Sequence, residues 1–408
     1  MEKLKRLIII APNDRYNYGD LLFSHIIKKE LGSLYDEIIN VATIENDLTQ
    51  VGGDKVLALS TIYSLSDDFE NHIIIAGGES FFSIWYYCLK YIDGNFASIM
   101  EPLSKVLRKV KLENIINSIS LLISKLKLGA TTKYPYTIGK NELKNIDRIF
   151  YNSLGGSSLK IENIKENLHI LKNVDYISLR DEHSYQMIKN SGIKDYLYPD
   201  CAIQMSKYYD LRNELQTKTS DLINSKINEE ESNYFVFQIN STLGEKYFEE
   251  IVDLINYIYL NHKAKVFLCP VGFALGHEDH IILKKIHNHI NNDSITIFYS
   301  NITIWDIMSI IGNSKMYIGT SLHGAITSMS FSVPYIGIMV NKTINYIKNW
   351  GIDSDFVTSH SFKHIKVSID ELQRDQTLKL VLKNNAKEQI SASEQSFYNI
   401  RNIISSKN

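Results

Sequence analysis

Short apolar runs alternate with amphipathic segments of helical period along most of the chain. Each run has the length of a buried strand and is rich in β-branched or aromatic residues. Because helical patterns lie between the runs, the sequence predicts an α/β fold with mostly parallel sheets. The clearest runs are residues 7–11, 72–76, 176–179, 234–239, 265–269 and 316–318.

A polar segment divides this pattern into two parts. Residues 209–232 lose the strand pattern and carry the acidic run 229–231 before a new apolar run begins. A chain of 408 residues is also long for one domain. We therefore expect two Rossmann-like domains, residues 1–215 and 232–408, facing a cleft with ligands at the carboxyl ends of the strands. The last helix is expected to pack back on the N-terminal domain.

Residues 96–130 differ from the rest of the N-terminal half. Apolar residues such as Ile115, Ile119 and Leu126 fall on one helical face, and lysine and arginine outnumber the acids. A basic amphipathic helix can lie on an anionic membrane surface. An apolar stripe is also typical of a helix that packs on the body of a protein, and both interpretations stay open.

Charge and cysteine content limit the partners and the compartment. The 44 Lys and Arg nearly balance the 46 Asp and Glu, which argues against a nucleic-acid partner. Cys88, Cys201 and Cys269 lack the spacing of metal or redox sites, so we expect free thiols, a reducing compartment and no metal. No apolar run suits a signal peptide or a membrane span. The expected location is the cytoplasm, with peripheral contact at the inner membrane surface if residues 96–130 bind lipid.

Polar and glycine-rich loops follow two predicted strands of the N-terminal domain. Backbone N–H groups at a helix start bind anions or sugars, and glycines let a backbone approach a substrate closely. Helix capping by an aspartate and a structural turn at the glycine pair are the alternatives. The candidates for ligand contact in these loops are Asn17, Gly19, Asp20, Gly77, Gly78 and Glu79.

A third predicted strand ends in a cation next to acids. Arg180 follows the run 176–179 and precedes Asp181 and Glu182. Its guanidinium can clamp a carboxylate or phosphate, or form a salt bridge with a neighbouring acid. Asp200 lies in a similar loop and can cap a helix or face the cleft.

The segment after the run 316–318 is the most informative. Residues 319–324 read Gly-Thr-Ser-Leu-His-Gly and lead into a helical pattern. Small residues between a strand and a helix suit a bound phosphate or carboxylate, and His323 adds a group that titrates near neutrality. Acid/base chemistry is expected here, although a single histidine is more often structural than catalytic.

In order along the chain, these segments resemble the motif series of the polysaccharide pyruvyl transferase family. The resemblance implies a GT-B-like fold, phosphoenolpyruvate as donor, and a hydroxylated sugar of a lipid-linked or polymeric glycan precursor as acceptor. It also implies a role in making capsule, exopolysaccharide or another part of the cell envelope, without a cofactor. The matching positions are Asn17-x-Gly19-Asp20, Gly77-Gly78, Ser178-x-Arg180-Asp181, Pro199-Asp200, Ser321-Leu322-His323-Gly324, Val333-Pro334 and Lys342.

The resemblance also assigns the site residues. His323 matches the motif histidine and Arg180 the strand-end arginine, and both are expected to be catalytic. Family members often carry arginine where this chain has Ser321, so Lys342, His277 or Lys263 is expected to supply replacement charge. The donor-binding candidates are Arg180, Thr320, Ser321, Leu322, His323, Gly324 and Lys342. The acceptor-binding candidates are Asn17, Gly19, Asp20, Gly77, Gly78, Glu79 and Asp181.

Two other functions fit the same features. A GT-B-type glycosyltransferase that uses a nucleotide sugar is one, because helix N-termini bind diphosphates equally well. A non-catalytic glycan-binding or assembly protein is the other, because Ser321 leaves one donor cation out of its usual place.

Overall fold

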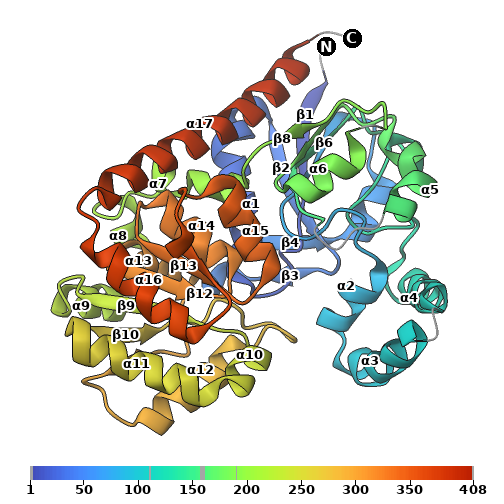
Figure 1. Ribbon diagram of the computed structural model, residues 1–408. Helices are drawn as coiled ribbons and strands as arrows, with labels where there is room; N and C mark the ends of the chain where they lie inside the picture. The colour runs from blue at the N-terminus through green and yellow to red at the C-terminus, as the bar shows by residue number, and fades with distance from the viewer. Residues whose placement is uncertain (1–2, 110–111, 157–160, 190, 407–408) are drawn as a thin grey trace.

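Two sheets, each flanked by helices, form the two lobes seen in Figure 1. The computed structural model describes residues 3–109, 112–156, 161–189 and 191–406. The expected α/β fold with mostly parallel sheets is confirmed. Among the described strands only the pair β3 and β4 runs antiparallel.

The first sheet has eight strands in the order β3-β4-β2-β1-β5-β6-β7-β8. β1 and β5 lie at its centre because their apolar residues are buried on both faces, as in residues 8–10 and 73–75. The register pairs Ile8 with Ile73 and Ile10 with Ile75. The strands are β1 (Leu4–Ile10), β2 (Glu37–Ala42), β3 (Asn46–Asp47), β4 (Lys55–Ala58), β5 (Phe69–Ala76), β6 (Arg148–Leu154), β7 (Tyr176–Leu179) and β8 (Tyr196–Leu197).

The second sheet has six strands in the order β11-β10-β9-β12-β13-β14. All residues of β9 are buried, because helices cover both of its faces and strands pair with both of its edges. The strands are β9 (Tyr234–Gln238), β10 (Lys265–Leu268), β11 (Thr296–Phe298), β12 (Met316–Gly319), β13 (Tyr335–Ile338) and β14 (Thr358–Ser359).

Helices connect the strands and include two in the polar segment between the sheets. Leu215, Ile223 and Ile227 of α8 and α9 are buried, so this segment packs on the second domain instead of forming an open linker. The helices are α1 (Tyr18–Leu31), α2 (Trp85–Ile92), α3 (Gly94–Lys109), α4 (Glu113–Leu128), α5 (Ile161–Leu171), α6 (Glu182–Ile188), α7 (Met205–Tyr208), α8 (Glu214–Lys218), α9 (Asp221–Glu229), α10 (Ser241–Lys246), α11 (Phe248–His262), α12 (Asp279–Ile290), α13 (Ile304–Gly312), α14 (Leu322–Ser330), α15 (Asn341–Trp350), α16 (Phe362–Arg374) and α17 (Leu378–Ser405).

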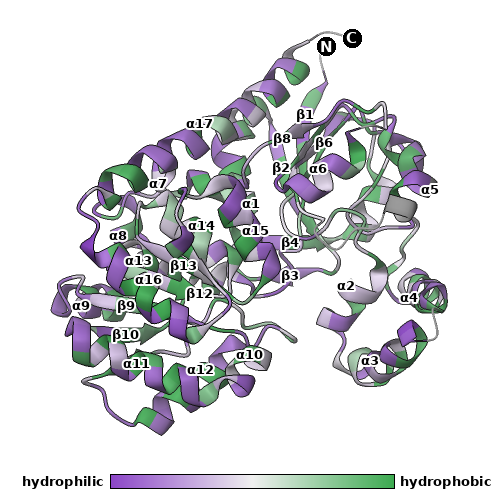
Figure 2. Ribbon diagram, viewed as in Figure 1, coloured by the Kyte–Doolittle hydropathy of each residue, from purple (hydrophilic) through white to green (hydrophobic). Residues whose placement is uncertain are grey.

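The helices α2, α3 and α4 project from the first domain as a separate cluster (Figure 1). Both α3 and α4 carry hydrophilic as well as hydrophobic residues (Figure 2). The single apolar face expected for residues 96–130 is divided in two. Ile116 packs in a small core with Phe96 and Met100, whereas Leu122 and Leu126 are 58% and 79% exposed. No helix among the described residues is both long and apolar enough to cross a membrane.

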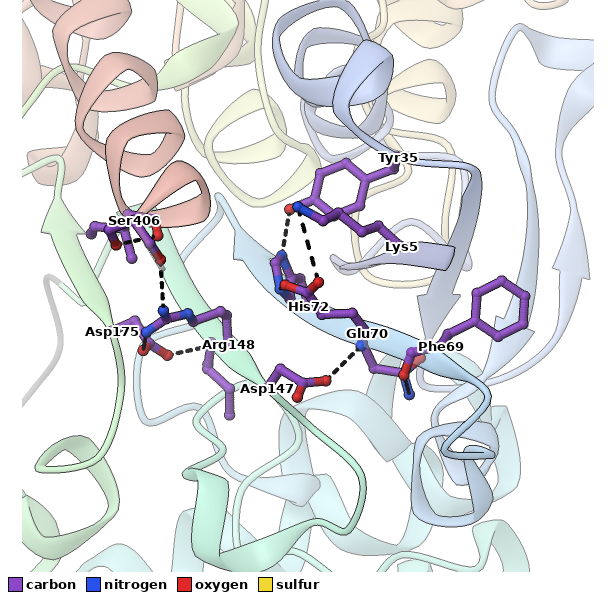
Figure 3. Close-up of polar contacts among 12 residues, drawn as sticks. Lys5, Tyr35, Phe69, Glu70, His72, Asp147, Arg148, Asp175 and Ser406 are labelled. Carbon is purple, nitrogen blue, oxygen red and sulfur yellow. Dashed lines mark hydrogen bonds and ion pairs between the residues drawn. The ribbon is translucent and has the colours of Figure 1, made fainter. Parts of the chain in front are cut away.

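A polar network occupies the amino edge of the first sheet (Figure 3). The buried His72 contacts Tyr35 and Glu70 through its two ring nitrogens, at 2.9 Å in each case. Arg148 contacts Asp175 at 3.0 Å in the same region. These groups hold one another, which marks this edge as structural and leaves the carboxyl edge for a site.

The last helix, α17, connects the two domains. Near its start Asn385 donates to the carbonyl of Trp350 in α15. Near its end Ser396 is hydrogen-bonded to Asn152 and Tyr176, which lie on strands of the first sheet. The helix therefore packs against both domains along its length.

Loss of packing beneath α17 is expected to destabilise the whole chain. Phe397 is fully buried in this helix and Tyr398 is 54% exposed. Phe397→Ala should cost about 3–5 kcal/mol because the cavity cannot collapse around a large ring. Thermal unfolding measures the effect, with Tyr398→Ala as the control. Equal losses in the two variants would contradict the packing described.

Candidate active site

Loops at the carboxyl ends of both sheets build one charged cluster. The loops after β5, β7 and β8 of the first domain carry Glu79, Arg180 and Asp200. The loop after β12 of the second domain leads to His323. In open parallel sheets this edge is where ligands bind, so the cluster lies where a site is expected.

Arg180 is the buried centre of the cluster. Its side chain is 2% exposed, Nη1 donates to Asp200 at 2.5 Å, and Nη2 donates to Glu79 at 3.0 Å. A Cβ on Gly155 would lie 2.6 Å from Arg180 Nε, so the loop after β6 needs glycine there. The sequence left open whether Arg180 clamps a ligand or forms a salt bridge. The structure shows salt bridges, to Asp200 and Glu79, which lie 20 and 101 residues away along the chain.

Asp200 is ionised at neutral pH. Burial alone would raise its pKa, but His323 and Arg180 lower that pKa to about 2. One carboxylate oxygen also accepts from the backbone N–H of Ala202, so Asp200 caps a short helical turn. The sequence offered a helix cap or a position facing the cleft as alternatives for Asp200. In the structure its carboxylate does both, since it caps a helical turn and faces His323.

His323 approaches this carboxylate from the second domain. Its Nε2 is 3.6 Å from the nearer oxygen of Asp200, which is beyond hydrogen-bond distance, and this buried nitrogen has no hydrogen-bond partner. The ring packs edge-on against Phe23. It also fills the space where a Cβ of Gly19 would lie. The Asn-x-Gly-Asp segment therefore needs glycine because a histidine of the other domain packs against it.

The side-chain amide of Gln238 holds the loop at residues 319–324 in place. Gln238, the last residue of β9, accepts from the backbone N–H of Ser321 at 2.8 Å and from the hydroxyl of Thr320 at 3.1 Å. Ser321 then caps α14 by accepting from the N–H of Gly324. A side chain on Gly324 would overlap the phenol of Tyr317. The donor-binding candidates of this loop thus form an ordered helix start, beneath which Leu322 is buried.

Asp279 lies behind the same loop and was not predicted from the sequence. Its side chain accepts from Gln238 at 2.8 Å and from the backbone N–H of Gly272. Burial raises its pKa to about 7. In the sequence Asp279 reads as an ordinary first residue of a helix, and no signal distinguishes it from a cap.

Asp20 and Asn17 lie together at the start of α1. Asn17 donates to Asp20 at 2.8 Å, and burial raises the pKa of this carboxyl group. Arg15, His323 and Lys342 all act on Asp20 electrostatically. The ring of His323 lies where a Cβ of the adjacent Gly19 would be, so the structure brings this pair of acceptor-binding candidates to the side of the site that carries the histidine.

Two glycines and one acid complete the predicted set. Gly77 and Gly78 adopt φ values of 60° and 67°, a backbone conformation that favours glycine. Gly77 also packs on the ring of Phe23. Asp181, by contrast, accepts from the backbone N–H of Ser184 at 2.8 Å and caps α6. Its carboxylate is engaged in this cap.

Lys263, His277 and Lys342 were expected to replace the arginine that this chain lacks at Ser321. The structure places them in three different environments. Lys263 ends α11 at the amino end of β10, so its assignment to the site was wrong. His277 lies at the carboxyl end, but burial and the nearby Lys342 and Arg15 lower its pKa to about 4. It is neutral at pH 7 and supplies no charge. Lys342 is exposed in the first turn of α15.

The three cysteines do not pair with one another. Cys88, Cys201 and Cys269 are free and buried. Within the described part of the chain, no group of three His, Cys, Asp or Glu residues is arranged to hold a metal ion.

Asp279 is expected to make the protein less stable as the pH rises from about 4 to 7. The folded chain, with a pKa of about 7 for Asp279, binds more protons in this range than the unfolded chain. Asp279→Asn should therefore flatten the decline of the melting temperature between about pH 5 and 7. Asp221→Asn, at an exposed helix start, is the control. Parallel pH profiles for wild type and Asp279→Asn would contradict the assignment.

Comparison with solved structures shows the GT-B fold. UDP-GlcNAc 2-epimerase from Methanocaldococcus jannaschii is 12% identical, with a TM-score of 0.52 over 98% of this chain and 99% of that chain. S. aureus MnaA, solved with UDP, is 12% identical, with a TM-score of 0.55 over 99% of both chains. The Neisseria meningitidis UDP-GlcNAc 2-epimerase, bound to UDP-GlcNAc, is 10% identical, with a TM-score of 0.54 over 98% of this chain and 100% of that chain.

Sequence comparison shows the family. No curated protein matches the chain. The model of the polysaccharide pyruvyl transferase family matches residues 17–342, which include the loops that contribute Glu79, Arg180, Asp200 and His323. This match covers most of the chain, and the chain therefore belongs to the polysaccharide pyruvyl transferase family.

Proposed function

We propose that the protein transfers the enolpyruvyl group of phosphoenolpyruvate to two hydroxyls of a sugar, giving a pyruvate ketal. As a family member the chain is a transferase, with a pyruvyl donor and a sugar or glycan acceptor. The acceptor belongs to a cell-surface polysaccharide, such as a capsule or exopolysaccharide, or to its lipid-linked precursor. The approach of His323 to the ionised Asp200 across the two domains carries this proposal.

The reaction needs groups that give and take protons. Protonation of C3 of the donor makes C2 electrophilic, and one sugar hydroxyl attacks it and loses its proton. A second hydroxyl then displaces phosphate and closes the ketal, again with loss of a proton. His323 can carry these protons because its buried Nε2 has no hydrogen-bond partner and lies 3.6 Å from the carboxylate of Asp200.

Arg180 contributes mainly through Asp200 in this mechanism. Its two terminal nitrogens already bind the carboxylates of Glu79 and Asp200. The guanidinium keeps Asp200 ionised and fixed beside the histidine. A direct contact with the donor would require Arg180 to exchange one of these pairs for the donor anion.

The substrates are placed between the two helix starts. The start of α14 offers the backbone N–H groups of Leu322 and His323 to the donor, because those of residues 320, 321 and 324 already bind Gln238 and Ser321. Lys342, in the first turn of α15, is the donor-binding candidate with a positive charge. The half-buried side chains of Asn17 and Glu79 offer polar groups to the acceptor, whereas Gly77 and Gly78 are buried and shape the loop between them. Asp20 and Glu79 are the acids available there to orient sugar hydroxyls.

Exposed apolar and basic residues form the outer face of α3 and α4, and they support an acceptor that lies at a membrane. Ile99, Val106 and Leu126 are each more than half exposed. Lys105, Arg108, Lys109, Lys125 and Lys127 accompany them, against Glu101 and Glu113. Apolar side chains beside basic ones suit an anionic bilayer surface. We place the protein in the cytoplasm at the inner membrane face, where a lipid-linked glycan is within reach.

His323→Ala is expected to lower the turnover number about 100-fold or more, the usual cost of losing a general acid or base. Phosphate release from phosphoenolpyruvate in the presence of lipid-linked glycans measures the rate, and mass spectrometry identifies the ketal. His262→Ala is the control, because His262 is also half-buried beside an aspartate, at 3.1 Å from Asp370.

Near-normal turnover of His323→Ala would remove this residue from the mechanism. A product heavier by a sugar, formed from a nucleotide sugar, would replace pyruvyl transfer by glycosyl transfer.

Binding to anionic vesicles should depend on the outer face of α3 and α4. Val106→Glu with Leu126→Glu should abolish co-sedimentation with phosphatidylglycerol vesicles, because the pair loses apolar contact and adds negative charge. Leu260→Glu, at a residue 61% exposed on α11, is the control. Equal binding to neutral phosphatidylcholine vesicles, or no effect of the double substitution, would contradict the proposal.

A further inference from the structure

Phosphoenolpyruvate presents two anionic ends, a carboxylate and a phosphate. A site that holds it in one orientation needs a positive or N–H-rich group for each end. Arg180 is already neutralised by Glu79 and Asp200, and Ser321 carries no charge. Lys342 can serve one end of the donor, and a further cation is needed for the other end.

Arg15 lies in the loop between β1 and α1 and has unused donors. Its side chain is 12% exposed, and neither Nε nor Nη1 makes a hydrogen bond. Nη1 forms an ion pair with the buried Asp14 at 3.5 Å, a distance too long for a strong hydrogen bond. The guanidinium lies 5.2 Å from the ring centre of Tyr91. A buried guanidinium with unpaired N–H groups is costly unless a ligand completes it.

A neighbouring amide in the same loop is also unused. Asn13 is 1% exposed, and neither its side-chain oxygen nor its nitrogen has a hydrogen-bond partner. The side-chain amide of Asn13, Nε and Nη1 of Arg15, and one carboxylate oxygen of Asp14, which lies between them in the sequence, all lack hydrogen-bond partners. Unpartnered N–H groups of two side chains in one loop, next to the start of a long helix, suit a site for an oxyanion, with the Asp14 carboxylate offset by Arg15.

The loop is held between the two domains. The carbonyl of Tyr16 accepts from the backbone N–H groups of Phe273 and Ala274, and Tyr18 donates to Val271. The rings of Tyr16 and Phe273 stack with their centres 4.4 Å apart. Arg15 is therefore placed at the domain boundary and not on a free surface.

Arg15 also shares a neighbour with the histidine. Arg15, His323 and Lys342 all act electrostatically on Asp20. A Cβ on Gly78 would lie 3.5 Å from the carboxylate of Asp20, so the loop at residues 77–79, which is proposed to bind the acceptor, lies next to Asp20. Arg15 thus lies in the same loop as Asn17, whose side chain donates to Asp20, and the positive charge of Arg15 acts on that carboxyl group.

We propose that Arg15, with the side-chain amide of Asn13, binds one oxyanion end of the three-carbon enol phosphate donor in place of a cation at Ser321. This inference rests on the proposed pyruvyl transfer. It assigns the second donor cation to the first domain, so the donor bridges the loops after β1 and β12.

Calorimetric titration of the full chain with phosphoenolpyruvate tests the assignment. Arg15→Gln should raise the dissociation constant about 10- to 100-fold, the worth of a charged hydrogen bond. Arg15→Lys should recover part of the affinity, because a point charge lacks the planar fork. Asn13→Ala should weaken binding by a smaller factor.

Arg6→Gln is the matched control. Arg6 lies at the opposite end of β1, is 14% exposed, and lies 3.7 Å from the ring centre of Phe69. Its substitution should leave the dissociation constant within about twofold of wild type, since it makes no contact at the carboxyl edge. Titration with inorganic phosphate and with pyruvate shows which end of the donor Arg15 holds, by which of the two loses affinity in Arg15→Gln.

The outcomes separate this inference from the proposed function. Wild type that binds phosphoenolpyruvate, with Arg15→Gln binding equally well, overturns the role of Arg15 alone. Wild type that does not bind phosphoenolpyruvate overturns both proposals. If Arg15→Gln does not fold, as judged by thermal unfolding, Arg15→Lys decides: wild-type affinity for phosphoenolpyruvate would overturn the role of the guanidinium.

Discussion

The buried guanidinium of Arg180 is the constraint on which the site depends. A charge that is only 2% exposed must be matched by opposite charge at close range, or it would cost several kcal/mol. Glu79 and Asp200 supply that charge from loops after two other strands. Removal of one partner would leave a buried charge unpaired. The pairing therefore fixes three loops of the first sheet relative to one another, and it places Asp200 opposite His323.

Space for this cluster comes from residues without side chains. Gly155 leaves room for Arg180, and Gly19 leaves room for the ring of His323. Gly324 does the same for the phenol of Tyr317, which supports the loop from inside the second sheet. Gly19 and Gly155 let polar groups from distant parts of the chain approach the backbone, whereas Gly324 faces a phenol only seven residues before it. Glycine is needed at Gly19 and Gly324 mainly because a neighbouring side chain occupies the space that a Cβ would fill, and less because of the turns in which they lie.

The sequence predicted local features well and long-range pairings poorly. The central strands were predicted because runs such as residues 7–11 are apolar on both faces. Arg180 and His323 were singled out because each follows a strand. The partners of Arg180 were not identified, since Glu79 is 101 residues away and pairing depends on the order of strands in the sheet. The roles of Asp279 and Arg15 were missed for the same reason: burial and an unpaired N–H are properties of the folded chain.

The two sides of the domain boundary are held by different forces. At the site edge the loop around Tyr16 contacts residues 271–274 through backbone hydrogen bonds, each worth about 0.5–1.5 kcal/mol net, and one ring stack. On the other side α17 buries Phe397 and Ile400 completely, and separation there would expose apolar surface at about 25 cal/mol per Å². Water can replace the first set of contacts but not the second. Between these two edges α1 packs on α13 and α14, and the fully buried Tyr18 is hydrogen-bonded to Thr327 at 2.8 Å. One apolar core therefore continues from the first domain into the second, and this core holds the domains together more strongly than the polar contacts at the site edge do.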